Sequence, residues 1–285
     1  MIVDRAAATL AEHGIESPRV DAEWIVAHVA GVSRSGLVAV SHEVDEREVE
    51  RLVRRRAARE PLAYVLGEWG FRRLILCCDP RALVPRPETE LLVERCMVRL
   101  QGVSAPRVLD VGTGTGAVAL ALADEAGAEV TATDISRDAL ELAADNAARA
   151  GLHVQLVQGD VRDALPVGPW DAIVSNPPYV KPAEWDGLSP EVRDWEPREA
   201  LVDEGQTGAI VRTALAELRP GGALLLEVHE ANAEAVAEAM RDKGYDGVTI
   251  TRDLAGRERI VEGERTWPNR FAAVSYTHLR SPRDS

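Results

Sequence analysis

The hydrophobic and polar positions of this chain follow two different patterns along its length. Over residues 4–60, apolar and charged side chains recur at the spacing of amphipathic helices. After Glu88, short apolar runs alternate with helical patterns, which is typical of a mainly parallel sheet covered by helices. The pattern therefore predicts an α/β fold preceded by a small helical domain.

Two amphipathic helices are predicted in the first region. One covers residues 19–30, and Gly31 is placed to end it, because glycine readily adopts the left-handed conformation found after helices. The other covers residues 45–59 and is followed by the helix breaker Pro61. Three consecutive arginines, residues 54–56, lie on this second helix, and we interpret them as a solvated face.

Seven apolar runs have the length of buried strands. They cover residues 107–111, 129–133, 153–157, 171–175, 222–228, 247–251 and 258–262. Helices are expected at residues 116–126, 136–150, 207–219 and 231–243. Only a short turn separates the last two strands, so we expect them to pair antiparallel.

The remaining segments define the predicted organisation. Residues 64–79 combine glycine, aromatic and apolar positions that are typical of a short hairpin. Residues 266–285 carry no periodicity and many polar side chains, so we expect a disordered tail. The predicted parts are a helical domain, a hairpin linker, an α/β domain and a tail, at residues 1–66, 67–87, 88–265 and 266–285.

Composition narrows the class of protein. Hydrophobic residues make up 46% of the chain, and the formal net charge is −14. No apolar stretch reaches the roughly 18 residues that indicate a membrane span, and no signal-peptide pattern is apparent. An acidic surface disfavours wrapping nucleic acid but suits a basic protein partner. We therefore expect no membrane contact and no direct nucleic-acid contact, and we also expect a cytoplasmic monomer.

The cysteines and histidines show no metal or disulfide pattern. Cys77, Cys78 and Cys96 form neither a disulfide framework nor a zinc-site spacing. No two of the six histidines have metal-ligand spacing on a shared element. We expect reduced thiols and no bound metal.

The most informative residues follow the apolar run at 172–175. The tetrapeptide Asn176-Pro177-Pro178-Tyr179 must end that strand, because two prolines cannot continue a ladder. Ligands bind at the carboxyl ends of strands in open α/β sheets. There, an amide side chain, free carbonyl groups and an aromatic ring can hold a planar nitrogen. A simple strand-stopping turn is the alternative, since Asn-Pro is common in turns.

A glycine-rich turn lies upstream, between the first predicted strand and its helix. Its sequence is Gly112-Thr113-Gly114-Thr115-Gly116. Glycines allow the backbone to approach a ligand, and the N–H groups at a helix start favour an anionic or polar one.

An acidic residue follows at the spacing found in nucleotide-binding units. Asp134 stands 22 residues after Gly112, at the end of the next predicted strand, where an acid grips ribose hydroxyls. Asp134 could instead cap the next helix, a role for which Ser136 is the better candidate.

The glycine spacing is G-x-G-x-G, which differs from the G-x-G-x-x-G of dinucleotide-binding folds. Together with the preceding Asp110, it resembles the class I S-adenosylmethionine-dependent methyltransferases. The Asn-Pro-Pro-Tyr tetrapeptide resembles the branch that methylates planar amide or amino nitrogens. Residues 83–90, Leu-Val-Pro-Arg-Pro-Glu-Thr-Glu, are similar to the signature of the release factor glutamine methyltransferases (PrmC, also called HemK). The resemblance covers roughly residues 5–262.

This resemblance implies a Rossmann-like, mainly parallel seven-stranded sheet that binds S-adenosylmethionine. Residues Gly112–Gly116 would hold the methionine and ribose part, and Asp134 would accept hydrogen bonds from the ribose. Asp160 would meet the adenine amino group, and Val161 would pack on the ring. Asn176 completes the implied cofactor-binding set. A plain turn is an equally open interpretation of Asp160.

The implied catalytic residues are Asn176, Pro177 and Tyr179, and with Pro178 they form the implied substrate site. A glutamine amide nitrogen is a poor nucleophile because its lone pair is delocalised into the carbonyl. The Asn176 side-chain oxygen and the Pro177 carbonyl would accept its N–H groups, and Tyr179 would pack on the amide plane. We assign no general base, since the N–H becomes acidic once the nitrogen is alkylated.

Two further segments match the family. Arg86, Glu88 and Thr89 would line the cofactor side of the cleft, although a helix start with Pro87 in its first turn explains them equally well. Glu196 belongs to a segment that resembles a family loop closing over the substrate.

The implied function is methyl transfer to N5 of the glutamine in the Gly-Gly-Gln motif of peptide chain release factors. One alternative is an amino methyltransferase acting on DNA or RNA bases or on a ribosomal-protein glutamine. Another is a binding module without catalysis. The acidic charge, the helical domain and residues 83–90 favour the release factors. The chain departs from the family at His229, where glycine is common, outside these motifs.

Overall fold

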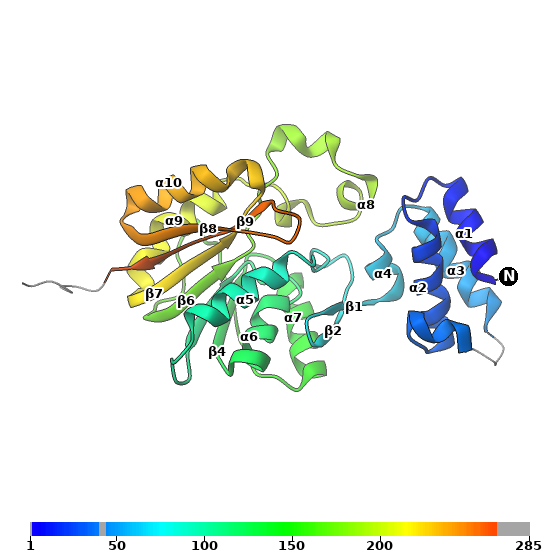
Figure 1. Cartoon of the computed structure of the whole chain (residues 1–285), viewed down its shortest axis with the longest axis horizontal. Helices are drawn as coiled ribbons and strands as arrows, with labels where there is room; N and C mark the ends of the chain where they lie inside the picture. The colour runs from blue at the N-terminus through cyan, green and yellow to red at the C-terminus, as the bar shows by residue number, and fades with distance from the viewer. Residues whose placement is uncertain (1, 40–43, 267–285) are drawn as a thin grey trace, which may run out of the picture.

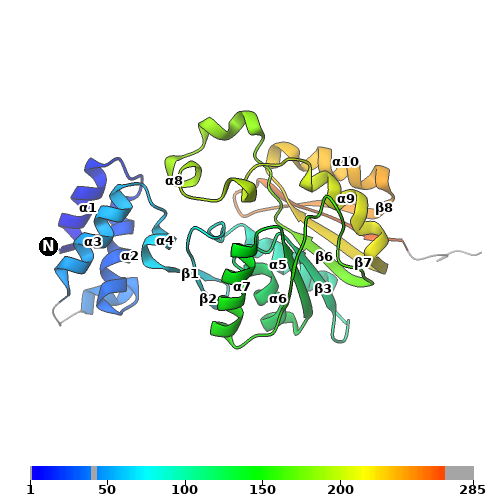
Figure 2. The ribbon, with the colours of Figure 1, turned by 180° about the vertical axis from the view of Figure 1, so that it is seen from behind.

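The structure of the chain, a computed structural model, describes residues 2–39 and 44–266. A group of N-terminal helices stands beside a larger body in which helices cover a sheet (Figure 1). The view from behind shows the same two parts (Figure 2). The disordered tail predicted for residues 266–285 lies outside the described residues, apart from Thr266.

Short helices build the N-terminal part around their own apolar core. Its elements are α1 (Ile2–Glu12), α2 (Pro18–Ala30), the 3-10 helix η1 (Arg34–Ala39), α3 (Glu46–Ala57) and α4 (Leu62–Leu66). Leu10, Ile25, Leu52 and Val65 pack together at its centre. As predicted, α2 ends at Gly31, which adopts a φ of 66°.

The arginine run on α3 is not a solvated face, and that prediction was wrong. Arg56 is only 8% exposed. Its Nε donates to Asp21 Oδ2 at 2.7 Å, and its Nη2 donates to Glu191 Oε1 at 3.1 Å. Arg55 is half-buried, and only Arg54 of the three is exposed. Consecutive residues of a helix point about 100° apart, so three neighbours cannot share one face.

The predicted hairpin is present after the helices, but residues 64–66 of the predicted range belong to α4. Strands β1 (Glu68–Phe71) and β2 (Leu74–Cys77) pair antiparallel. The side chain of Asn146, on helix α7 (Arg137–Ala150), holds β2 from outside: its Oδ1 accepts from Cys77 N at 2.6 Å and its Nδ2 donates to Cys77 O at 3.2 Å. The hairpin is thereby anchored to the α/β body.

The main sheet of the described residues has the strand order β5-β4-β3-β6-β7-β9-β8. Its strands are β3 (Arg107–Val111), β4 (Glu129–Asp134), β5 (Gln155–Gln158), β6 (Trp170–Ser175), β7 (Leu218–Glu227), β8 (Tyr245–Arg252) and β9 (Glu258–Arg265). The strands from β5 to β7 pair parallel, whereas β9 runs antiparallel to both β7 and β8. This confirms the predicted mainly parallel sheet and its antiparallel final pair.

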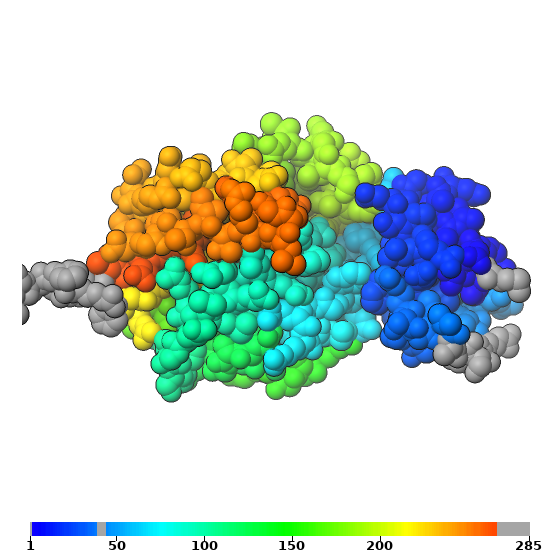
Figure 3. Space-filling view, viewed as in Figure 1, coloured from blue at the N-terminus to red at the C-terminus, as the bar shows by residue number. Residues whose placement is uncertain are grey.

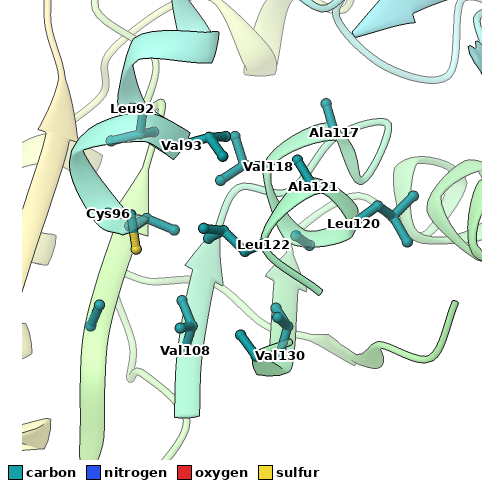
Figure 4. Close-up of a cluster of buried hydrophobic side chains, with 14 of the residues drawn as sticks. Leu92, Val93, Cys96, Val108, Ala117, Val118, Leu120, Ala121, Leu122 and Val130 are labelled. Carbon is teal, nitrogen blue, oxygen red and sulfur yellow. The ribbon is translucent and has the colours of Figure 1, made fainter. Parts of the chain in front are cut away.

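Alternate residues of the strands enter two cores, one on each face of the sheet. Val108 packs under α5 (Thr89–Arg99) and α6 (Ala117–Ala126), as Figure 4 shows. Its neighbour Leu109 packs under α9 (Gln206–Glu217) and α10 (Ala233–Lys243). Both faces are covered, which explains why the central strands appear in the sequence as continuous apolar runs.

Short elements complete the body. They are η2 (Pro182–Gly187), α8 (Pro190–Arg193), η3 (Arg198–Ala200) and η4 (Glu230–Asn232). No helix within the described ranges is long and apolar enough to cross a membrane. In the same residues, the three cysteines are free, and no group of three or more potential ligands is arranged to hold a metal.

Candidate active site

A cleft opens where the parallel strands end. Residues directly after β3, β4, β5 and β6 line it, and its empty volume is about 1130 Å³ when the open mouth is included. The strand β3 lies between β4 and β6, so the chain order reverses at this point of the sheet. Such reversals leave a crevice between neighbouring loops.

The glycine-rich turn forms one wall of this cleft. Gly112 and Gly114 have φ angles of 73° and 54°, in the left-handed region that glycine adopts without strain. A Cβ added at Gly112 would meet nothing within 4 Å, so the backbone there faces open space. Gly116 also has a positive φ but serves as the N-cap of α6 and does not line the cleft.

A buried carboxylate, Asp110, is hydrogen-bonded to the glycine-rich turn. Asp110 is the fourth residue of β3, and its Oδ2 accepts from the Thr113 hydroxyl at 2.7 Å. Burial raises the pKa of Asp110 to about 7, and the hydrogen bond from Thr113 opposes that rise.

Asp134 closes the same wall at the end of β4. Its Oδ2 accepts from Gly114 N and its Oδ1 from Ser136 N, both at 2.9 Å. Ser136 is the N-cap of α7, because its Oγ accepts from Ala139 N at 3.3 Å. The capping role therefore falls to Ser136, and Asp134 links the glycine turn to the helix start at the cleft.

Asp160 and Val161 lie on the cleft wall after β5. Asp160 accepts from the backbone N–H of Arg162 at 2.8 Å, and its Oδ2 pairs with Arg162 Nη2 at 2.7 Å. That ion pair and hydrogen bonding lower the pKa of Asp160. The turn interpretation of Asp160 is thus observed, while its contact with an adenine stays a prediction.

The Asn-Pro-Pro-Tyr segment forms the opposite wall. Asn176, Pro177 and Pro178 line the cleft, whereas Tyr179 lies outside its lining, with its ring centroid 6.1 Å from that of His229. The Asn176 amide is oriented by Thr89, because its Nδ2 donates to Thr89 Oγ1 at 3.2 Å. Its Oδ1 is then the atom available to accept a hydrogen bond in the cleft.

The sequence left two roles open for residues 86–89, lining the cleft and starting a helix, and the structure shows both. Thr89 is the first residue of α5 and also lines the cleft, as does Arg86. Arg86 Nη2 donates to Glu196 Oε2 at 2.6 Å. Burial raises the pKa of Glu196, and the Arg86 guanidinium counteracts the rise. Glu88, by contrast, points to Arg257, with an Nη2–Oε1 distance of 3.2 Å.

One buried acid at this site was missed by sequence reasoning. Glu227, the last residue of β7, is 1% exposed, and burial raises its pKa to about 7. A carboxylate directly after the apolar run Leu224-Leu225-Leu226 was the available signal, since strand ends in this sheet meet at one edge.

Comparison with known proteins places this geometry in a family. Residues 2–67 match the family described as the PrmC N-terminal domain, and residues 87–189 match the methyltransferase small domain. The release factor glutamine methyltransferase of Deinococcus radiodurans is 45% identical, over 93% of this chain and 97% of that protein. The enzyme of that name from Bordetella pertussis is 43% identical, over 89% and 97%.

The chain belongs to the release factor glutamine methyltransferase family. It is therefore an S-adenosylmethionine-dependent methyltransferase. Its fold is also similar to that of the Thermus thermophilus 16S rRNA N2 G1207 methyltransferase solved with AdoMet and guanosine. That likeness has a TM-score of 0.52 at 24% identity and covers 70% of this chain and 49% of the other.

The cleft fits the cofactor of a release factor glutamine methyltransferase. The open space over Gly112 admits a ligand against the backbone, and the Asp134 carboxylate retains lone pairs for hydroxyl donors. The apolar side of the wall includes Val161 and Ile135, which suit a flat ring.

Proposed function

We propose that the chain transfers the methyl group of S-adenosylmethionine to the side-chain amide nitrogen, N5, of the glutamine in the Gly-Gly-Gln motif of peptide chain release factors. The observation that carries this proposal is the Asn176 amide, held by Thr89 in the same cleft as the glycine-rich turn. The names of its relatives agree with it.

The glycine wall would bind the cofactor, which supplies an activated methyl group on a sulfonium. Residues Gly112–Gly116 would follow the methionine and ribose part, and Asp134 would accept from the ribose hydroxyls. Asp160 would meet the adenine amino group beside Val161. Because Asp134 is already fixed by two backbone N–H groups, little ordering is needed when the ligand binds.

The opposite wall would hold the acceptor. The Asn176 Oδ1 and the Pro177 carbonyl would each accept one N–H of the glutamine amide, which aims the nitrogen and localises electron density on it. Pro178 would shape the wall, and Tyr179 would pack near the amide plane from its position beside His229. The bound cofactor would supply the methyl group to this nitrogen and leave as the neutral thioether, and the nitrogen would then release one N–H proton to solvent.

The N-terminal helices would bind the body of the release factor. We propose that residues 1–66 recognise the partner, residues 67–87 link the two parts and residues 88–265 carry out methyl transfer. The net charge of −14 suits a partner with basic surface better than a phosphate backbone. We further propose that the enzyme acts as a monomer, without direct nucleic-acid contact, in the cytoplasm where release factors meet ribosomes.

Methyl-labelled S-adenosylmethionine tests the acceptor directly. The protein is incubated separately with a release factor, a ribosomal protein, and DNA or RNA, and each product is analysed by mass spectrometry. We expect one added methyl on the glutamine of the Gly-Gly-Gln motif. Label in nucleic acid or ribosomal protein, with none in the release factor, would support an alternative acceptor instead.

A further inference from the structure

Asn146 is a buried polar side chain behind the glycine-rich turn, and the proposed chemistry does not use it. It is 1% exposed and belongs to the buried side of α7, together with the apolar Leu142 and Ala143. It does not line the cleft. Burying an amide costs free energy unless its polar atoms are hydrogen-bonded, so the partners of Asn146 indicate what it does.

The hairpin fixes the orientation of the Asn146 amide. Its Oδ1 accepts from Cys77 N at 2.6 Å, and its Nδ2 donates to Cys77 O at 3.2 Å. The side-chain amide thus pairs with one backbone residue of β2 as a residue of a neighbouring antiparallel strand would. Because the Cys77 N–H needs an acceptor, the pairing determines which side of the amide carries the oxygen.

The remaining Asn146 proton is donated to the glycine-rich turn. An amide nitrogen carries two protons, and the one that does not bond to Cys77 is donated to Thr115 O, with an Nδ2–O distance of 2.9 Å. Thr115 lines the cleft, whereas Asn146 lies behind it. The Thr115 carbonyl is therefore turned away from the cleft.

The orientation of this carbonyl needs support because the next residue is a glycine. Gly116 has a φ of 82°, and glycine adopts positive and negative φ about equally well, so local sterics do not fix the peptide unit between Thr115 and Gly116. Two bonds hold it: Asn146 donates to its carbonyl, and its N–H donates to Thr113 O at 2.9 Å. A rotated unit would turn a carbonyl oxygen toward a site where N–H groups favour anionic ligand groups.

We propose that Asn146 is a positioning residue for the cofactor site, which holds the Thr115 carbonyl away from the cleft and ties the glycine-rich turn to the hairpin. This inference rests on the proposed placement of S-adenosylmethionine against Gly112–Gly116. Asn146 lies outside the cleft, so its effect reaches the cofactor through the turn. It therefore acts on cofactor affinity more than on the methyl-transfer step.

Titration calorimetry with S-adenosylmethionine tests this role without any acceptor. Asn146→Ala removes all three hydrogen bonds, and we expect the affinity to fall about 10-fold, the effect of leaving one buried carbonyl without its donor. Met240→Ala is the matched control, because it creates a cavity beneath α10 in the core on the other face of the sheet. It should keep the wild-type affinity.

Calorimetry also separates positioning from a merely structural role. Partial unfolding lowers the number of binding-competent sites and leaves the affinity of each site unchanged, whereas a displaced turn lowers the affinity itself. We therefore expect Asn146→Ala to bind at full stoichiometry with a raised Kd.

Asn146→Asp tests the same contact at constant shape, and it answers the question also if Asn146→Ala does not fold. Its ionised carboxylate cannot donate to Thr115 O, so the affinity should fall at neutral pH. A protonated carboxyl can donate, and burial favours the protonated form. The ratio of wild-type to variant affinity should therefore decrease as the pH falls.

Each outcome bears on one claim. Wild-type affinity in Asn146→Ala, an equal loss in Met240→Ala, or a pH-independent ratio for Asn146→Asp would overturn the positioning role. A wild-type protein that does not bind S-adenosylmethionine would refute the placement of the cofactor. A protein that binds it and leaves the release factor unmethylated would refute only the proposed acceptor.

Discussion

Arg56 Nη2 lies 3.1 Å from Glu191 Oε1, so a buried arginine of α3 joins the N-terminal helices to the short helix α8. The two residues are 135 positions apart in the chain. Figure 3 shows the N-terminal helices packed beside the segment that contains α8. Arg59 Nη1 adds a second contact, at 2.9 Å from the same Glu191 oxygen. The position of the N-terminal helices is therefore tied to the segment that leads to Glu196.

The contribution of Arg56 to stability can be tested against Arg54, an exposed arginine on the same helix. Arg56→Ala leaves the buried Asp21 without its cation, whereas Glu191 keeps Arg59, and removing one partner of a buried pair costs about 3–5 kcal/mol. The exposed Arg54→Ala should stay within about 0.5 kcal/mol of wild type. Thermal and urea denaturation measure both. Equal stability of the two variants would show that the Arg56 cluster contributes nothing net.

Asp134 is expected to control cofactor affinity. Asp134→Ala removes the ribose acceptor and frees the N–H groups of Gly114 and Ser136, and hydrogen bonds to a charged group are worth about 1.5–3 kcal/mol. Titration calorimetry should therefore show S-adenosylmethionine binding weakened by at least about 10-fold. The exposed Asp138→Ala, in the first turn of α7, is the control. Equal affinity in all three proteins would exclude the ribose assignment.

Asn176 is expected to act on rate more than on cofactor binding. Asn176→Ala removes an acceptor whose interaction with the substrate nitrogen strengthens in the transition state, and loss of one such group commonly costs about 10²–10³ in rate. Single-turnover kinetics with a release factor measure the chemical step, and calorimetry measures the cofactor affinity. Near-normal turnover would rule out the amide clamp.

The raised pKa of Asp110 should make the stability of the folded protein depend on pH. Burial raises its pKa from 3.8 to about 7, so the folded chain keeps a proton that the unfolded chain loses at lower pH. The contribution of Asp110 to the free energy of unfolding is fully present below about pH 4 and is lost as the pH rises through about 7. Asp110→Asn keeps an acceptor for Thr113 and has no such proton.

The unfolding free energy of wild type should therefore fall relative to Asp110→Asn between about pH 4 and about pH 8. Other titrating groups are common to both proteins and cancel in the difference. Parallel stability curves across this range would contradict the raised pKa of Asp110.

The strands could be predicted because a run of consecutive apolar residues marks each of them in the sequence. The run at 107–111 coincides with β3, since burial on both faces demands continuous apolar residues. β7 begins at Leu218, four residues before the predicted 222, because Leu218 pairs with Trp170 across an irregularity in register. Its Pro220 and glycines do not resemble a strand, so pairing overrode the local pattern.

The site was predictable only as far as it follows strand ends. Asn176 and Asp134 were found because Asn176 directly follows β6 and Asp134 is the last residue of β4. Glu227 also ends a strand, but its nearly complete burial depends on how the helices pack over the sheet, which the local sequence pattern does not reveal. The burial of Arg56 likewise depends on partners such as Glu191 that are distant in the chain, which periodicity cannot reveal.

The hydrogen-bonded pairing of β3 with β6, with Val111 opposite Ser175, joins the two walls of the cleft directly. Most residues assigned to the methyl donor lie at the ends of β3, β4 and β5, and those assigned to the acceptor follow β6, including Asn176, which is assigned to both. In evolutionary terms, the donor half can be inherited unchanged while the segment after β6 and the N-terminal helices diversify. Strand pairing, rather than any loop, would keep the reacting atoms in line throughout such a change.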